Sequence, residues 1–295
     1  MKTAIFKVYL LFGLVMASAT AADYVEPVKS PIDPKQYRYL TLDNSLRVLL
    51  VSDPDTDKAG ASLDVHIGNS SDPAEWQGLA HFLEHMLFLG NGKYPEPGEY
   101  QNYINANGGS NNAYTAFGHT NYFFNVAQDK LEPALDRFSR FFIDPTFDPT
   151  FVDRERAVVH SEYQARRKEE GRRIWAANKA LINPGHPASN FAVGSLDTLR
   201  DRDGITARDK LIEFYDQYYS ANLMTLAVVG RESLDQLETW VREKFSEVPN
   251  KDVLKPKFIQ SYFNRELLPA RIHIVPEERQ QQVMFQFEIE STQQF

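Results

Sequence analysis

The 295-residue sequence contains no cysteine. This absence excludes disulfide bonds and thiolate metal sites, so any zinc site must use histidine and carboxylate ligands. Basic residues are also in deficit: 32 lysines and arginines face 40 acidic residues, which gives a formal net charge of −8. Because no extended Lys/Arg-rich run is present, the charge balance argues against a nucleic-acid partner and against binding to anionic membranes.

Long apolar runs are scarce, and the one near the start is short. Lysines precede an apolar run at 8–15, and small residues follow at 17–22. This order predicts a secretory signal peptide over 1–21, cleaved after Ala19 or Ala21. The run is too short for a bilayer core of about 30 Å, so a membrane anchor is the weaker interpretation. We expect an exported protein, periplasmic or secreted, without a stable membrane span after cleavage.

Apolar residues make up 42% of the chain, enough for a sizeable core. Alternating and helical patterns are both grouped and interleaved, with hairpins, which predicts an α+β fold. The expected strands lie at 39–42, 47–51, 61–67, 111–116, 120–126, 223–229, 271–275 and 283–289. The expected helices lie at 72–90, around 100–104, and at 131–143, 151–181, 206–220 and 233–245.

The sequence His81-Phe82-Leu83-Glu84-His85 is an H-x-x-E-H motif. On a helix the two histidines lie one turn apart on the same face, where they can bind one metal ion. Glu84 borders that face, so its carboxylate can reach a water molecule at the metal and act as general base. The order of these residues, the reverse of H-E-x-x-H, is the inverzincin signature of zinc peptidases.

The alternative is that both histidines are ordinary polar residues of an amphipathic helix, since a five-residue motif alone is a hypothesis. The surrounding helix is strongly apolar, however, and buried imidazole and carboxylate groups need partners. A catalytic zinc ion also needs a third protein ligand. The expected helix at 151–181 offers Glu155 and Glu162, seven residues apart and therefore on one face. Composition does not choose between them, and a solvated helical glutamate is the commoner fate of either one.

Several ordered motifs resemble the pitrilysin/insulysin (M16) zinc metallopeptidases, most closely the insulin-degrading-enzyme branch. The resemblance covers about 30–295. It is carried by "HFLEHMLFLG" at 81–90, "GGSNNAYTAFGHTNYFFNV" at 108–126, "LDRFSRFFIDPTFD" at 135–148, "DRERAVVHSEY" at 153–163, "YYSANLMTLAVVGRESLD" at 218–235 and "KFSEVPNK" at 244–251.

The resemblance implies a mixed, largely antiparallel sheet flanked by helices. It also implies one Zn²⁺ per chain, held by His81, His85 and Glu162. Glu84 would be the general base, and Glu155 a second acidic residue that supports the catalytic site. The implied activity is that of a metalloendopeptidase that hydrolyses peptides and small unfolded proteins by attack of a zinc-activated water molecule.

Substrate binding is implied for a second segment. Asn112 and Ala113 match the family's edge strand, which pairs with the substrate backbone; such main-chain bonds suit broad sequence specificity. Phe88 and Trp175 resemble apolar pocket residues, although core packing is the alternative for Phe88. Between Glu162 and Trp175 the chain is slightly longer than the insulin-degrading pattern, which leaves the position of Trp175 open.

The resemblance implies a domain organisation. We expect a zinc-binding catalytic domain at 22–255, then a linker and the start of a second M16 domain at 256–295. Because active members resemble chains of four such domains that close into a chamber, we expect a C-terminal half or partner chain to be required for full activity. A binding subunit without chemistry is the competing hypothesis, but inactive members lose H-x-x-E-H or the distal glutamate, and both are present here.

Overall fold

The computed structural model describes residues 28–277, 281–287 and 289. The expected signal peptide at 1–21 lies outside these residues and stays a prediction. Within the described part of the chain, no helix is long and apolar enough to cross a membrane.

A six-stranded sheet forms the centre of the fold, in the order β1-β2-β6-β3-β5-β4. Only β2 and β6 pair in parallel; the other four pairings between neighbours are antiparallel. The predicted α+β class and the mixed, largely antiparallel sheet are therefore confirmed. The strands are β1 (Gln36–Thr41), β2 (Arg47–Ser52), β3 (Lys58–Val65), β4 (Ser110–Thr115), β5 (Thr120–Ala127) and β6 (Met224–Gly230).

Alternation along the strands decides which face of the sheet is buried. In β6, Met224, Leu226 and Val228 are buried while the residues between them are half-buried. Because successive side chains point to opposite faces, this pattern directs one face into the core. β6 lies between β2 and β3, so a segment far along the chain completes the sheet that begins at residue 36.

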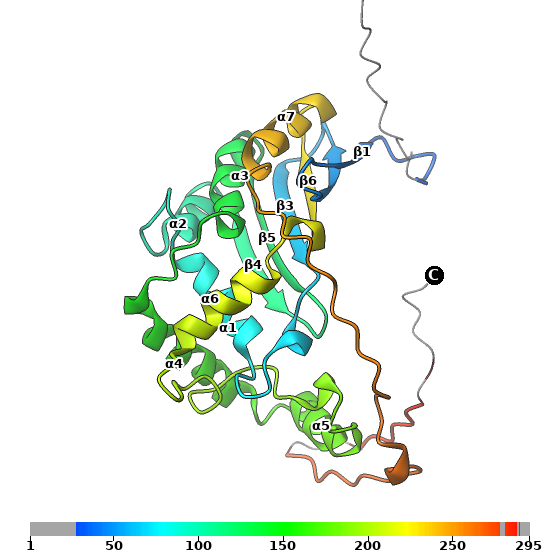
Figure 1. The fold of residues 1–295 in the computed structure, drawn as a ribbon. Coiled ribbons are helices and arrows are strands. Elements are labelled where there is room, and N and C mark those ends of the chain that lie inside the picture. The colour runs from blue at the N-terminus through cyan, green and yellow to red at the C-terminus, as the bar shows by residue number, and fades with distance from the viewer. Residues whose placement is uncertain (1–27, 278–280, 288, 290–295) are drawn as a thin grey trace, which may run out of the picture.

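Helices α1, α2, α3 and α7 pack against the sheet, α4 and α6 pack on α1 beside β4, and α5 lies away from the sheet (Figure 1). α7 lies at the other end, against β1, β2 and α3. β4 is one of the two edge strands of the sheet and lies next to α1. The helices are α1 (Leu79–Met86), α2 (Glu99–Ala106), α3 (Leu131–Ser139), α4 (Pro149–Arg166), α5 (Glu170–Asn178), α6 (Ala207–Tyr218) and α7 (Leu234–Phe245).

The helix that carries the H-x-x-E-H motif begins later than expected. The prediction of a helix from residue 72 is wrong, because α1 starts at Leu79. The buried Asp72 carboxylate instead reaches forward and accepts hydrogen bonds from the backbone N–H groups of Gly78 and Ala80, at 2.7 and 2.8 Å. Asp72 thus caps α1 from six residues before its N-cap.

The long helix expected at 151–181 is two helices. α4 ends at Arg166 and α5 begins at Glu170, with Glu169 extended at ψ 131°. Gly171 lies inside α5. The extended residue interrupts the helical path, so the side chains of α5 do not continue the faces of α4.

The two strands expected at 271–275 and 283–289 are absent from the described residues of those segments. No described strand pairs with them, and apolar side chains such as Val275, Val283 and Phe285 are each 81% exposed. A strand needs a partner to satisfy its backbone groups, so these sequences lack the contact that would order them. The linker before them is held by an isolated bridge between Ile182 and Phe263.

Candidate metal centre

Helix α1 presents two imidazoles to one point. His81 and His85 lie one turn apart, with ring centroids 4.9 Å apart and ring planes nearly perpendicular. The opposite face of α1 is apolar, and its buried Phe82, Leu83 and Met86 fix the rotation of the helix. The local pattern therefore leaves the histidines on the half-buried face, as the sequence predicts.

Helix α4 supplies the carboxylates. Val152, Glu155 and Val159 are buried along one stripe of α4, and Glu162 continues that stripe one turn further on. Both glutamates therefore face α1, as their seven-residue spacing predicts, but they contact different atoms. The Glu162 carboxylate oxygen Oε2 lies 3.7 Å from His81 Nε2 and 3.8 Å from His85 Nε2, whereas Glu155 Oε2 lies 3.6 Å from His85 Nδ1.

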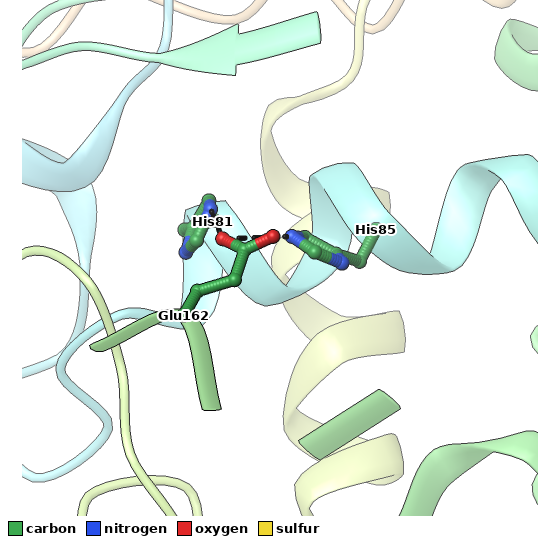
Figure 2. Close-up of side chains that lie close together, drawn as sticks. All are labelled: His81, His85 and Glu162. Carbon is green, nitrogen blue, oxygen red and sulfur yellow. Dashed lines mark ion pairs between the residues drawn. The ribbon is translucent and has the colours of Figure 1, made fainter. Parts of the chain in front are cut away.

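Each imidazole is oriented through its Nδ1 atom. His81 Nδ1 lies 2.6 Å from the backbone carbonyl oxygen of Val193, so Nδ1–H donates and Nε2 keeps its lone pair. Glu155 does the same for His85, since its carboxylate faces Nδ1–H. Such outer partners fix the tautomer and the direction of a metal-binding histidine. Both Nε2 atoms are thereby directed at the Glu162 carboxylate (Figure 2).

This donor set fits zinc. Among the described residues, His81, His85 and Glu162 are the one group of at least three potential ligands whose donor atoms lie within 4.8 Å of one another. Tetrahedral ligands at about 2.1 Å from zinc would lie about 3.4 Å apart, close to the separations found here. Three protein ligands of nitrogen and oxygen leave the fourth position open, as in catalytic rather than structural zinc sites.

Electrostatics of the histidines and glutamates follow from burial and from their neighbours. Burial lowers the pKa of His81, and the positive charges of His85 and Arg172 lower it further. The pKa of His85 is raised, because the nearby carboxylates, Glu155 foremost, outweigh its burial. The same contact with His85 holds the pKa of Glu155 below its usual value.

Glu84 lies beside His81, His85 and Glu162 and is not part of that candidate ligand set. Its side chain is buried, and burial raises its pKa. The hydroxyl of Thr115 on β4 donates to Glu84 Oε2 at 2.6 Å, which opposes that shift and fixes the carboxylate. Because α1 packs against β4, this hydrogen bond ties the motif helix to the edge strand.

The three candidate ligands and Glu84 line a cavity of about 750 Å³. One side of it is the edge strand β4, from Asn111 to Thr115. Asn112 and Ala113 therefore lie at the cavity, and their role in substrate binding stays a prediction. The backbone N–H of Ala113 donates to the side-chain oxygen of Asn112 at 3.0 Å.

Of the two expected pocket residues, one lines the cavity and the other does not. Phe88 lines the cavity and also packs on Phe141, with ring centroids 5.1 Å apart, so its functional and packing interpretations are compatible. Trp175 is 45% exposed and does not line the cavity. Arg172, three residues earlier and in the first turn of α5, takes that place. The break between α4 and α5 sets which residue faces the ligands.

Sequence reasoning missed four contributors to the centre. Thr115 follows Ala113 by two residues, so strand alternation could have placed it on the same side. No sequence motif contained or indicated Arg166 or Arg172. No motif could indicate the Val193 carbonyl, because the position of a backbone oxygen is not specified by residue type.

Comparisons with known proteins agree with this geometry. A family model described as "Insulinase (Peptidase family M16)" matches residues 47–184, and one described as "Peptidase M16 inactive domain" matches residues 206–295. The crystal structure of pitrilysin superposes with a TM-score of 0.80 and 37% identity, over 82% of this chain and 26% of pitrilysin.

Curated relatives match the same part of the chain. Human insulin-degrading enzyme is 48% identical over 251 residues, which cover 84% of this chain and 25% of the relative. A putative zinc protease of Schizosaccharomyces pombe is 48% identical over 230 residues, or 77% of this chain and 24% of the relative. The chain thus spans about a quarter of the length of these relatives. Sequence motifs, sheet topology and both family models converge, and the chain belongs to peptidase family M16, the insulinase family.

Proposed function

We propose that this chain is the catalytic part of a zinc-dependent endopeptidase that hydrolyses peptides and small unfolded proteins. One observation carries the proposal: the Nε2 atoms of His81 and His85 and a Glu162 oxygen converge at a cavity that also holds the buried Glu84. A binding subunit without chemistry would not need a general base beside an open metal position.

His81, His85 and Glu162 would hold the ion. Zinc in such a site supplies a Lewis acid that makes water nucleophilic at neutral pH. Thr115 engages Oε2 of Glu84, which leaves Oε1 to accept the proton of the attacking water and pass it to the leaving amine. Burial strengthens this role, because a raised pKa makes the carboxylate a better base.

The edge strand β4 would align the substrate. An extended peptide that adds to β4 would place one of its amides over the metal ligands, with main-chain hydrogen bonds that are indifferent to side chains. Asn112 and Ala113 would lie at this contact. The Ala113 N–H then exchanges the Asn112 side-chain oxygen for a substrate carbonyl.

Two further features belong to the proposal. Because the chain spans about a quarter of its curated relatives, we expect polypeptide corresponding to the rest of them to complete a chamber and to be required for full activity. The lysines, apolar run and small residues at the start favour export to the periplasm or outside the cell. N-terminal sequencing of the mature protein, with a new terminus after Ala19 or Ala21, would test export.

The central test uses metal content and hydrolysis together. The chain, joined to the polypeptide that follows in its relatives, should bind one zinc ion and cleave a quenched fluorescent peptide. Chelator should abolish cleavage and zinc should restore it. Glu84→Gln should retain zinc and lose cleavage, whereas His81→Ala should lose both. Unchanged cleavage in Glu84→Gln would remove the proposed general base.

A further inference from the structure

One wall of the metal cavity is cationic. Arg166, the last residue of α4, and Arg172, in the first turn of α5, both line the cavity that holds the metal ligands. The other charged groups of the lining that bear a carboxylate are Glu84, Glu155 and Glu162. Each of these three glutamates already has a role at the candidate metal centre. The two arginines are charged groups of the same lining to which no role has been assigned.

Neither guanidinium is strongly engaged by the protein. Within the described part of the chain, Arg166 forms no ion pair, and Arg172 Nε lies 3.8 Å from Glu169, beyond hydrogen-bond distance. Arg173 provides the contrast, because it is held by Glu170 at 3.0 Å and by the Val275 carbonyl at 2.9 Å. Arg173 has a structural role, whereas the two cavity arginines keep their donors available.

The position of this wall determines what it would meet. A peptide paired with β4 lies in the same cavity as Arg166 and Arg172, since β4 residues 111–115 form another part of the lining. The charge of Arg172 also reaches His81, one of the metal ligands. A substrate side chain close to the scissile bond therefore comes within reach of one or both guanidinium groups.

The chemistry of that wall selects for carboxylates. A guanidinium presents its N–H donors in a fixed fork that matches the two oxygens of a carboxylate. Arg166 is exposed and Arg172 is half-buried, so an aromatic or aliphatic side chain would leave the charge of Arg172 unpaired in the cavity, whereas an acidic one would pair with it. Arg172 stands where the apolar Trp175 was expected, so this subsite is cationic instead of apolar.

We infer that Arg166 and Arg172 form a subsite for a substrate carboxylate, so that the enzyme favours peptides with an acidic group next to the cleaved bond. The inference rests on the proposed peptidase function and specifies its substrate class. The acidic group can come from an Asp or Glu side chain or from the C-terminus of a short peptide, and the two sources share the same chemistry.

The test measures binding as well as cleavage. The 295-residue chain carrying Glu84→Gln and loaded with zinc would be titrated with three labelled peptides that differ only at one residue and at the C-terminus. The first has a single Glu and an amidated C-terminus, the second has Gln in its place, and the third has Gln with a free C-terminal carboxylate. Fluorescence anisotropy should show about tenfold tighter binding for one or both acidic peptides, as for a charge-assisted hydrogen-bonded pair.

Substitutions then assign the effect. Arg172→Gln and Arg166→Gln should each shrink the preference for the acidic peptide, and the double variant should abolish it. Arg167→Gln is the matched control, since Arg167 is exposed, adjacent to Arg166 and absent from the cavity lining. It removes the same charge and should leave the preference unchanged. Circular dichroism and zinc content would confirm that each variant is folded.

Two outcomes would overturn the inference: equal affinity for acidic and neutral peptides, or a preference that survives in the double variant. Failure here remains distinct from failure of the proposed function. The preference is a ratio of affinities measured on an inactive protein, whereas the function is tested by zinc-dependent cleavage of the neutral peptide by the protein with Glu84 intact.

Discussion

His81 and Val193 are 112 residues apart in the sequence, yet the imidazole Nδ1 of His81 lies 2.6 Å from the carbonyl oxygen of Val193. The contact depends on close packing of two chain segments at neighbouring residues. Gly78, the N-cap of α1, lies against Gly194, and a Cβ added at Gly78 would be 2.2 Å from the Gly194 Cα. The imidazole of His81, a proposed metal ligand, is therefore oriented by a backbone approach that only glycine permits.

Gly78→Ala should weaken zinc binding. The added methyl group must displace the segment around Gly194, which moves the Val193 carbonyl away from His81. Loss of such an orienting partner costs about 10–100-fold in metal affinity. The steric conflict should also lower the free energy of unfolding by more than about 2 kcal/mol. Competition with a chromophoric chelator and thermal unfolding would measure the two effects.

Gly98→Ala is the matched control. Gly98 is also the N-cap of an eight-residue helix with positive φ, 83° against 90° for Gly78. Its added Cβ would meet nothing closer than the Asn102 amide nitrogen at 3.8 Å. Backbone strain alone should cost about 1 kcal/mol or more and leave zinc affinity unchanged. Equal zinc affinity in the two variants would contradict the role given to the Gly78–Gly194 contact.

Asp72→Ala should destabilise the fold more than removal of an exposed helix cap. The Asp72 carboxylate is buried, and its loss strands the N–H groups of Gly78 and Ala80 away from water. We expect a loss of about 2–4 kcal/mol, since each unsatisfied buried donor costs about 1–3 kcal/mol. Asp148→Ala, which removes an exposed cap at Thr150 on α4, should cost about 1 kcal/mol. Chemical denaturation would compare them, and equal losses would contradict this account of Asp72.

Glu155 and Glu162 should differ in their effect on zinc. Glu162→Gln removes the carboxylate that lies near both Nε2 atoms, so zinc binding should be largely lost. Glu155→Gln removes only the negative charge that faces His85 Nδ1, so affinity should fall about tenfold while the ligands remain. Isothermal titration with zinc would rank the variants. The reverse order would show that Glu155 is the third ligand.

Thr115 should affect chemistry and leave metal binding intact. Thr115→Val keeps the shape of the side chain but removes the hydroxyl that donates to Glu84 Oε2. A freed carboxylate is poorly placed for proton transfer, so kcat should fall about tenfold or more, the equivalent of a hydrogen bond to a charged group. KM and zinc content should hardly change. Thr115→Ser should restore most of the activity, and equal activity in both variants would argue against this positioning role.

The H-x-x-E-H spacing and the seven-residue spacing of Glu155 and Glu162 are helical periodicities that hold within one element, so sequence patterns predicted which helix faces carry these side chains. The choice of Glu162 over Glu155 as third ligand came from the family resemblance and stays a prediction. Sequence patterns could not predict the roles of residues that depend on the junction between two elements. The break between α4 and α5 decided that Arg172, and not Trp175, faces the cavity. The start of α1 at Leu79 depended on a buried Asp72 cap, which looks like an ordinary helix N-cap in sequence. The described residues of the expected strands at 271–275 and 283–289 form no strand, which shows that alternation is insufficient without a partner strand.

The last prediction concerns the 295-residue chain by itself, which should show little peptidase activity although its ligand set is complete. An edge strand can align a peptide, but β4 would contact only one side of it. Displacement of the scissile amide by about 1 Å can cost around a hundredfold in rate. Water in the cavity also weakens the stabilisation of the developing negative charge.

A short quenched fluorescent peptide should therefore be cleaved at least about a hundredfold faster when the polypeptide that follows in the relatives is supplied in trans or in one chain. The matched control supplies that polypeptide to Glu84→Gln, which should stay inactive. Chelator-sensitive cleavage by the isolated chain at the rate of the completed protein, absent in Glu84→Gln, would show that this domain positions its substrate unaided.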